Sequence, residues 1–227
     1  MRAPVRPGPR AGLTLIELLV ALSLMALVSV LSWRGIDGLT QARARLRAQG
    51  DDVLLLQATL TQWRLDLDAL APQPKRPALD WDGRTLRLLR HAPLGNGAVV
   101  VAWGWRAQVG QPALGEWVRW QSPPLTDRAA LDAAWQQAPA MLVNRGVAPA
   151  HQALATVALT GWQLFYYRNN AWSNPLSSVG AEAEGGAARA ESGVPDGVRA
   201  VLDLAPGQAL SGRITQDWVN PLLRGAR

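Results

Sequence analysis

The sequence predicts an α+β protein in which a long N-terminal helix, transmembrane in its first half, packs on one or two antiparallel β-sheets. Three observations predict this fold. The apolar run from Leu13 to Trp33 has the ~20 residues that a helix needs to cross a bilayer. A stripe of apolar residues at helical spacing continues from Leu39 to Leu70. After Pro72, several segments alternate apolar and polar residues with the period of two that is typical of strands.

The long helix divides the chain into four parts. Residues 1–12 form a leader that contains Arg2, Arg6 and Arg10 and no acidic residue. We expect residues 13–33 to be the transmembrane half of the helix and residues 34–71 its second half. Residues 72–227 are expected to form one β-rich globular head, which is long enough to bury a core of its own.

The apolar stripe of the second half is narrow and flanked by polar residues. Its members are Leu46, Val53, Leu56, Leu60, Trp63, Leu67 and Leu70. Such a stripe needs an apolar partner, and we expect the strands of the head to cover it from Leu56 onward. Pro72 and Pro74 end the helix. Asp66 and Asp68 are not expected to act as a carboxylate pair, because residues two apart on a helix point in different directions. We expect both to be polar residues that flank the stripe.

Turn and strand signals fill the head. Asp82-Gly83 predicts a hairpin between residues 79–81 and 85–88. The other alternating segments are 99–106, 117–120, 162–167, 198–204 and 210–218. A short helix from Thr126 to Gln137, with Thr126 as its N-cap, is expected between them. Residues 174–192, rich in Ser, Gly, Ala and Glu, are expected to form a mobile loop.

Glu17 does not fit an ordinary membrane span, because a carboxylate in lipid is costly and usually functional. A secretory signal peptide would have a shorter apolar region that ends in small residues, and this one ends at Trp33. A plain signal anchor leaves Glu17 unexplained. The segment Gly12-Leu13-Thr14-Leu15-Ile16-Glu17 resembles the type IV prepilin signature: Gly, an apolar residue, Thr, Leu, an aliphatic residue and Glu.

This resemblance implies a pilin-like fold and a defined processing step. A prepilin peptidase would cut between Gly12 and Leu13 and methylate the new amino terminus of Leu13. Glu17 would serve assembly, because its carboxylate would pair with the amino terminus of a neighbouring subunit and set the register of the packed tails.

Three segments of the head and one segment just past the apolar run resemble the minor pseudopilin J of type II secretion systems. They are residues 117–128 (WVRWQSPPLTDR), 160–168 (TGWQLFYYR) followed by Trp172, 194–204 (VPDGVRAVLDL), and 34–39 (RGIDGL) just past the apolar run. The resemblance implies a single-pass inner-membrane protein with a periplasmic C-terminal head. It would support protein export from near the tip of the pseudopilus, together with I-type and K-type subunits and other pseudopilus subunits.

Two residues of the helix and three tryptophans are candidates for partner contacts in such an assembly. Leu46 and Val53 form the part of the stripe that the head is expected to leave free for a neighbouring helix. Trp81, Trp120 and Trp172 lie outside the clearest apolar faces, and we expect them to be available to partners. Two alternatives remain: a minor pilin of a type IV pilus, and a membrane-anchored periplasmic enzyme or sugar-binding domain.

The sequence predicts no catalytic site, no metal site and no cofactor. His91 and His151 have no metal-ligand spacing, and Asp80-x-Asp82-Gly83 lacks the later acidic residue of a calcium loop. The absence of cysteine excludes thiolate chemistry and a disulfide. Nucleic-acid binding is not expected either. The leader holds three of the 23 basic residues, so 20 face 17 acidic residues in the rest of the chain, without a basic block.

Overall fold

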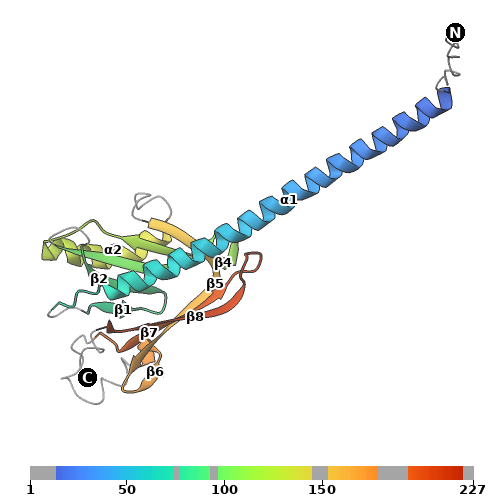
Figure 1. Ribbon diagram of the computed structural model, residues 1–227. Helices are drawn as coiled ribbons and strands as arrows, with labels where there is room; N and C mark the ends of the chain where they lie inside the picture. The colour runs from blue at the N-terminus through green and yellow to red at the C-terminus, as the bar shows by residue number, and fades with distance from the viewer. Residues whose placement is uncertain (1–13, 74–76, 93–96, 145–152, 178–193, 222–227) are drawn as a thin grey trace, which may run out of the picture. The chain divides into compact units, whose positions relative to one another are not determined.

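The computed structural model describes residues 14–73, 77–92, 97–144, 153–177 and 194–221 (Figure 1). The chain forms two compact units, one up to Ala48 and the other from Gln49. Helix α1 (Leu15–Asp68) begins in the first unit and ends in the second, which confirms the predicted long helix.

The first unit, within its described residues, consists of the N-terminal part of α1. Every described residue from Thr14 to Ala48 is exposed, including the apolar residues up to Trp33. A helix segment that is apolar on all sides and exposed in its described residues is typical of a membrane segment or of a packed bundle. Helix α1 is long and apolar enough to cross a membrane.

The second unit is built on one antiparallel sheet of eight strands. In sheet order these are β1 (Leu79–Trp81), β2 (Thr85–His91), β3 (Ala98–Gln108), β4 (Gln111–Gln121), β5 (Ala153–Arg168), β7 (Gly197–Leu204) and β8 (Gly212–Val219), with β6 (Ala171–Ser173) paired to β5. The predicted hairpin is confirmed, since Trp81 of β1 faces Leu86 of β2. Strands β4 and β5 are longer than predicted, and Leu210 lies before β8 rather than within it.

The C-terminal part of α1 packs on one face of the sheet. Leu56 is its first buried apolar residue, and Trp63 and Leu67 are almost completely buried. They join one core cluster with apolar residues from β1, β2, β3, β4, β5, β7 and β8. The predicted stripe therefore meets the sheet from Leu56 onward, as expected.

A second core lies on the opposite face of β2, β3 and β4, under helix α2 (Arg128–Val143). The sequence predicted a covering helix for one face only. Strand β3 explains the difference, because Val99 and Val101 face α1 whereas Val100 and Ala102 face α2. A strand that is covered on both faces has a continuous apolar sequence.

The predicted ends of the short helix were wrong. Asp127 is the N-cap in place of Thr126, and its carboxylate accepts a hydrogen bond from the backbone N–H of Ala130. The helix continues beyond Gln137 and includes Pro139. The residues that anchor its second half to the sheet, Ala138 and Leu142, are buried, and this packing offsets the unfavourable proline. Of the predicted loop at 174–192, residues 178–192 lie outside the described part of the chain.

Two of the three tryptophans that were expected to meet partners are core residues. Trp81 stacks edge-to-face on Trp162, with ring centroids 4.7 Å apart, and Trp120 lies in the core under α2. Trp172 keeps 36% of its surface exposed. Arg199 stacks over its ring at 4.2 Å from the centroid. Among these three tryptophans, only Trp172 remains available to a partner.

Candidate assembly site

The first turn of α1 holds Glu17 by a reciprocal cap with Thr14. The Glu17 carboxylate accepts from the backbone N–H of Thr14 at 3.1 Å and from its hydroxyl at 3.0 Å. In return, the Glu17 N–H donates to Thr14 Oγ1 at 3.4 Å. This is a capping box, which satisfies donors that the helix would otherwise leave free. The predicted processing residues, Gly12 and Leu13, lie outside the described part of the chain.

Leu46 and Val53, the predicted partner-binding residues, differ in exposure. Leu46 is 67% exposed, whereas Val53 is half-buried. The predicted stripe omits a second exposed pair, Leu54 and Leu65, which are 63% and 52% exposed. Eleven residues span about three helical turns, so these two leucines share one side of α1. The predicted stripe runs along a different side of the helix, so the side with Leu54 and Leu65 counted as part of its polar flank.

Asp66, which the sequence predicts to be a solvated polar flank, is fully buried where α1 meets the sheet. Arg119 donates to its two oxygens at 2.7 and 2.8 Å, Trp103 Nε1 donates at 2.9 Å, and Gln62 donates at 3.0 Å. Arg90 forms a further ion pair with it. The residues from β2, β3 and β4 thus converge on one carboxylate of α1.

Two other carboxylates also connect α1 to the rest of the head, one to β8 and one to the β7–β8 connection. Asp68 accepts from Trp218 Nε1 at 2.8 Å, and Asp52 accepts from the backbone N–H of Ala209 at 3.1 Å. In the sequence each of these acids stands beside the apolar stripe, which is the ordinary appearance of a solvated helix flank. Only the position of the partners in space distinguishes an anchoring acid from a solvated one.

The acidic residues that resembled a calcium loop are engaged within their own hairpin. Asp80 forms an ion pair with Arg87. Asp82 accepts from the backbone N–H groups of Arg84 and Thr85, at 2.9 and 2.7 Å. These bonds make Asp82 a turn residue. His91 is exposed, and His151 lies outside the described residues.

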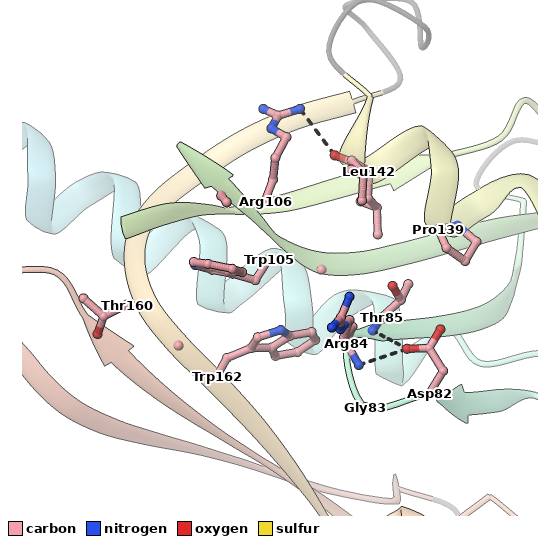
Figure 2. Close-up of a pocket in the computed structure, with 14 residues that line it drawn as sticks. Asp82, Gly83, Arg84, Thr85, Trp105, Arg106, Pro139, Leu142, Thr160 and Trp162 are labelled. Atoms are coloured by element: carbon pink, nitrogen blue, oxygen red, sulfur yellow. Dashed lines mark hydrogen bonds between the residues drawn. The ribbon is translucent and has the colours of Figure 1, made fainter. Parts of the chain in front are cut away.

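The head also contains a cavity of about 720 Å³, shown in Figure 2. It lies between the β1–β2 turn, the end of α2 and parts of β3 and β5. Trp105 and Trp162 line it, together with Pro139 and Leu142 of α2. No single sequence motif predicts this cavity, because its walls come from four separate segments.

Comparison with known proteins identifies the N-terminal segment. Residues 9–33 match the family model of the prokaryotic N-terminal methylation motif. A search of curated proteins found no match. The matched segment includes Gly12, Leu13 and Glu17 and ends at Trp33. The motif implies processing by a prepilin peptidase and assembly into pilus-like filaments. With its exposed apolar helix and antiparallel sheet, the chain has the N-terminal motif and the α+β layout of a type IV pilin-like protein.

Proposed function

We propose that this protein is a minor pseudopilin of a type II secretion system, which acts by assembly and not by catalysis. The observation that carries the proposal is the methylation motif at residues 9–33, which joins a basic leader, Glu17 and an apolar helix in one segment. The J-like segments of the head support the choice of a minor pseudopilin over a pilus subunit. Those in the head lie in β4 and the segment that leads into α2, in β5 and β6, and in β7 with the residues just before it.

In this proposal the protein waits in the inner membrane with its head in the periplasm. The prepilin peptidase cuts after Gly12 and methylates Leu13. The freed tail then leaves the bilayer by packing against the tails of neighbouring subunits, near the tip of the pseudopilus. I-type and K-type subunits are the expected neighbours. Burial of the exposed apolar surface drives this packing, and Glu17 sets its register.

Glu17→Ala is expected to leave membrane insertion and the folded head intact and to weaken incorporation into the pseudopilus. Insertion does not suffer, because the change makes the helix more hydrophobic. We would measure co-purification with neighbouring subunits and secretion in a deletion strain.

Glu17→Gln separates the two roles of the carboxylate. An amide oxygen can still accept the Thr14 hydrogen bonds, but it carries no charge for a neighbour's amino terminus. If assembly depends on the charge, Glu17→Gln fails as Glu17→Ala does. If the glutamine variant assembles normally, Glu17 acts as a helix cap and its proposed register role is wrong.

The helix face at Leu46 and Val53 is expected to contact an I-type or K-type tail. The full-length protein would be co-expressed with both subunits, and the complex isolated in detergent. Leu46→Asp should reduce recovery of the complex about tenfold or more, because it places an unpaired charge in an apolar seam. Val53→Thr is the milder change at the second position, since Val53 is already half-buried in its own head.

Leu54→Asp is the matched control, because Leu54 is similarly exposed on another side of the helix. Loss of the complex in Leu46→Asp alone would support the proposed seam. Loss in Leu54→Asp alone would move the contact to the side of Leu54 and Leu65. A wild-type protein that binds pilus subunits and supports piliation, instead of secretion, would identify it as a minor pilin of a type IV pilus.

A further inference from the structure

Helix α1 passes from the first compact unit into the second as one helix, and the boundary between the units falls between Ala48 and Gln49 (Figure 1). Gly50 comes directly after this boundary. A Cβ placed on Gly50 would meet nothing within 4 Å, and its φ is not positive. Neither close packing nor backbone conformation therefore requires a glycine here. In the interior of a helix, glycine is the least favourable residue apart from proline.

The residues before Gly50 have the features of a helix C-terminus. Arg43, Arg45 and Arg47 are exposed, and no acidic residue lies among them. Basic side chains near the end of a helix interact favourably with its dipole, and glycine is the preferred residue just after a helix end. If a helix ended at Gln49, Gly50 would occupy that position and the arginines would lie near the end.

The residues after Gly50 have the features of a helix N-terminus. Asp51 is exposed, and its side chain has no partner among the residues that the structure describes. Aspartate is unfavourable inside a helix but is one of the best N-cap residues. Asp52 would place a second acid in the first turn, where the helix dipole favours it. Asp51 is therefore better suited to begin a helix than to continue one.

Water can reach the backbone around Gly50. Every described residue from Thr14 to Asp51 is exposed. Gly50 lies about 25 Å along the helix beyond Trp33, where the apolar segment ends. Water can therefore replace the backbone hydrogen bonds that a break at this point would open.

Packing on the head begins immediately after this point. Asp52 accepts a hydrogen bond from the backbone N–H of Ala209 at 3.1 Å, and Val53 is half-buried. A break at Gly50 would thus leave the packed part of α1 attached to the sheet and would disturb no buried side chain.

We propose that Gly50 is a hinge at which α1 opens reversibly into two helices. In the open state the first helix ends at Gln49, and the Asp51 carboxylate caps the second. The open state lets the folded head change its direction while the tail stays fixed in a bilayer or in a bundle of tails. The hinge is a property of this chain alone, so it applies equally to a subunit of a secretion pseudopilus and to one of a type IV pilus.

Two other glycines of α1 provide a comparison. Gly35 and Gly38 also have open space around them. However, neither follows a group of basic residues, and neither stands next to the point where packing on the head begins. Asp37, the acid between them, already has a partner in the continuous helix, because it accepts from Gln41 Nε2 at 2.9 Å. We therefore expect the helix to stay unbroken at these two glycines.

Distances between paired spin labels, measured in the full-length protein in lipid nanodiscs, test the proposal. The chain contains no cysteine, so only introduced cysteines carry labels. Thr40→Cys with Ala58→Cys spans Gly50, and the control pair, Leu22→Cys with Thr40→Cys, spans the two other glycines; all three positions are exposed. Each pair is separated by about five helical turns, which is ~27 Å in a continuous helix. We expect a second population, away from this distance, for the pair that spans Gly50 alone.

Substitutions at the hinge make the test specific. Gly50→Ala should lower the ratio of open to continuous helix about fivefold or more, because alanine is the better helix former. Asp51→Ala should lower the ratio by about the same factor, because alanine is a poor N-cap, whereas Asp51→Asn should keep the second population. Gly38→Ala is the matched control and should leave the ratio unchanged. Near-ultraviolet circular dichroism of each variant checks that the head is folded.

The proposal is overturned if the pair that spans Gly50 shows a single distance or if the control pair shows the same second population. It is also overturned if Gly38→Ala lowers the ratio as much as Gly50→Ala, or if Asp51→Ala leaves the ratio unchanged. The hinge and the proposed function can fail separately. If the second population is present but deletion of the protein leaves secretion intact, the hinge is supported and the proposed secretion function is wrong.

Discussion

Asp66→Asn is expected to destabilise the head by roughly 3–5 kcal/mol, the usual cost of removing one partner from a buried ion pair. The substitution keeps the shape of the side chain and removes its charge. It removes the charged carboxylate that pairs with Arg90 and Arg119, whose side chains are only 13% and 11% exposed. The Trp103 Nε1 donor would at the same time lose a charged acceptor. Urea unfolding of the full-length protein in detergent, followed by near-ultraviolet circular dichroism, would measure the loss.

Asp68→Asn is the matched control on the same helix. Asp68 accepts a hydrogen bond from Trp218 and pairs at 3.8 Å with the exposed Arg64, and its side chain is 39% exposed, so water can replace much of what is lost. We expect a cost of about 1 kcal/mol, which is typical of a single hydrogen bond. Equal losses in the two variants would show that the buried cluster contributes no more than an ordinary surface contact. In that case Asp66 would not be the main polar anchor of α1.

The Asp66 cluster also shows what the sequence could and could not predict about the fold. The helix, the first hairpin and the strand alternation depend on local periodicity, and the structure confirms them. The role of Asp66 depends on residues 24 and 53 positions away, Arg90 and Arg119. Local periodicity contains no information on such pairs, so a buried anchor and a solvated flank have the same sequence pattern.

The predicted positions of tryptophans failed for a related reason. Trp81 lies in a three-residue strand, which is too short to show which of its faces is covered. Its burial is set by Trp162, more than 80 residues later, and Trp162 also stacks on Trp117 with centroids 5.6 Å apart. Indole rings are stabilised both by the area that they bury and by favourable ring geometry, so tryptophans tend to form such clusters. The position of a tryptophan in the sequence alone therefore does not exclude it from a cluster.

At the N-terminus the segment from Thr14 to Glu17 has both a structural property and a family signature. The Thr14-x-x-Glu17 spacing is a capping box, which starts a helix, and it is also part of the prepilin signature. The prediction from the sequence depends on the second property alone. In the full-length chain Glu17 therefore has a partner in Thr14, and a neighbouring amino terminus must compete with these bonds or add to them. The proposed comparison of Glu17→Ala with Glu17→Gln depends on this difference.

Gly12→Val is expected to block maturation almost completely. The bond after Gly12 is the one that the prepilin signature assigns to the peptidase, and a β-branched side chain there would obstruct the approach of the catalytic groups to its carbonyl. Since misplacement of reacting groups by about 1 Å can cost roughly 100-fold in rate, we expect cleavage to slow by at least that factor. Intact-mass spectrometry of the membrane fraction should find wild-type chains that begin at Leu13 with one added methyl group, and variant chains that keep the leader.

Ala11→Val is the control for this prediction, because it places the same side chain one residue before Gly12 and leaves the attacked carbonyl unobstructed. It should be processed far more completely than Gly12→Val. Retention of the leader should also prevent assembly, since the amino group that Glu17 of a neighbour would bind is then absent from position 13. If Gly12→Val is processed as fast as the wild type, or if mature wild-type chains begin after Trp33, the cleavage site is not at Gly12. In the second of these cases the apolar segment would be removed as a signal peptide, and the tail could not serve as the assembly element.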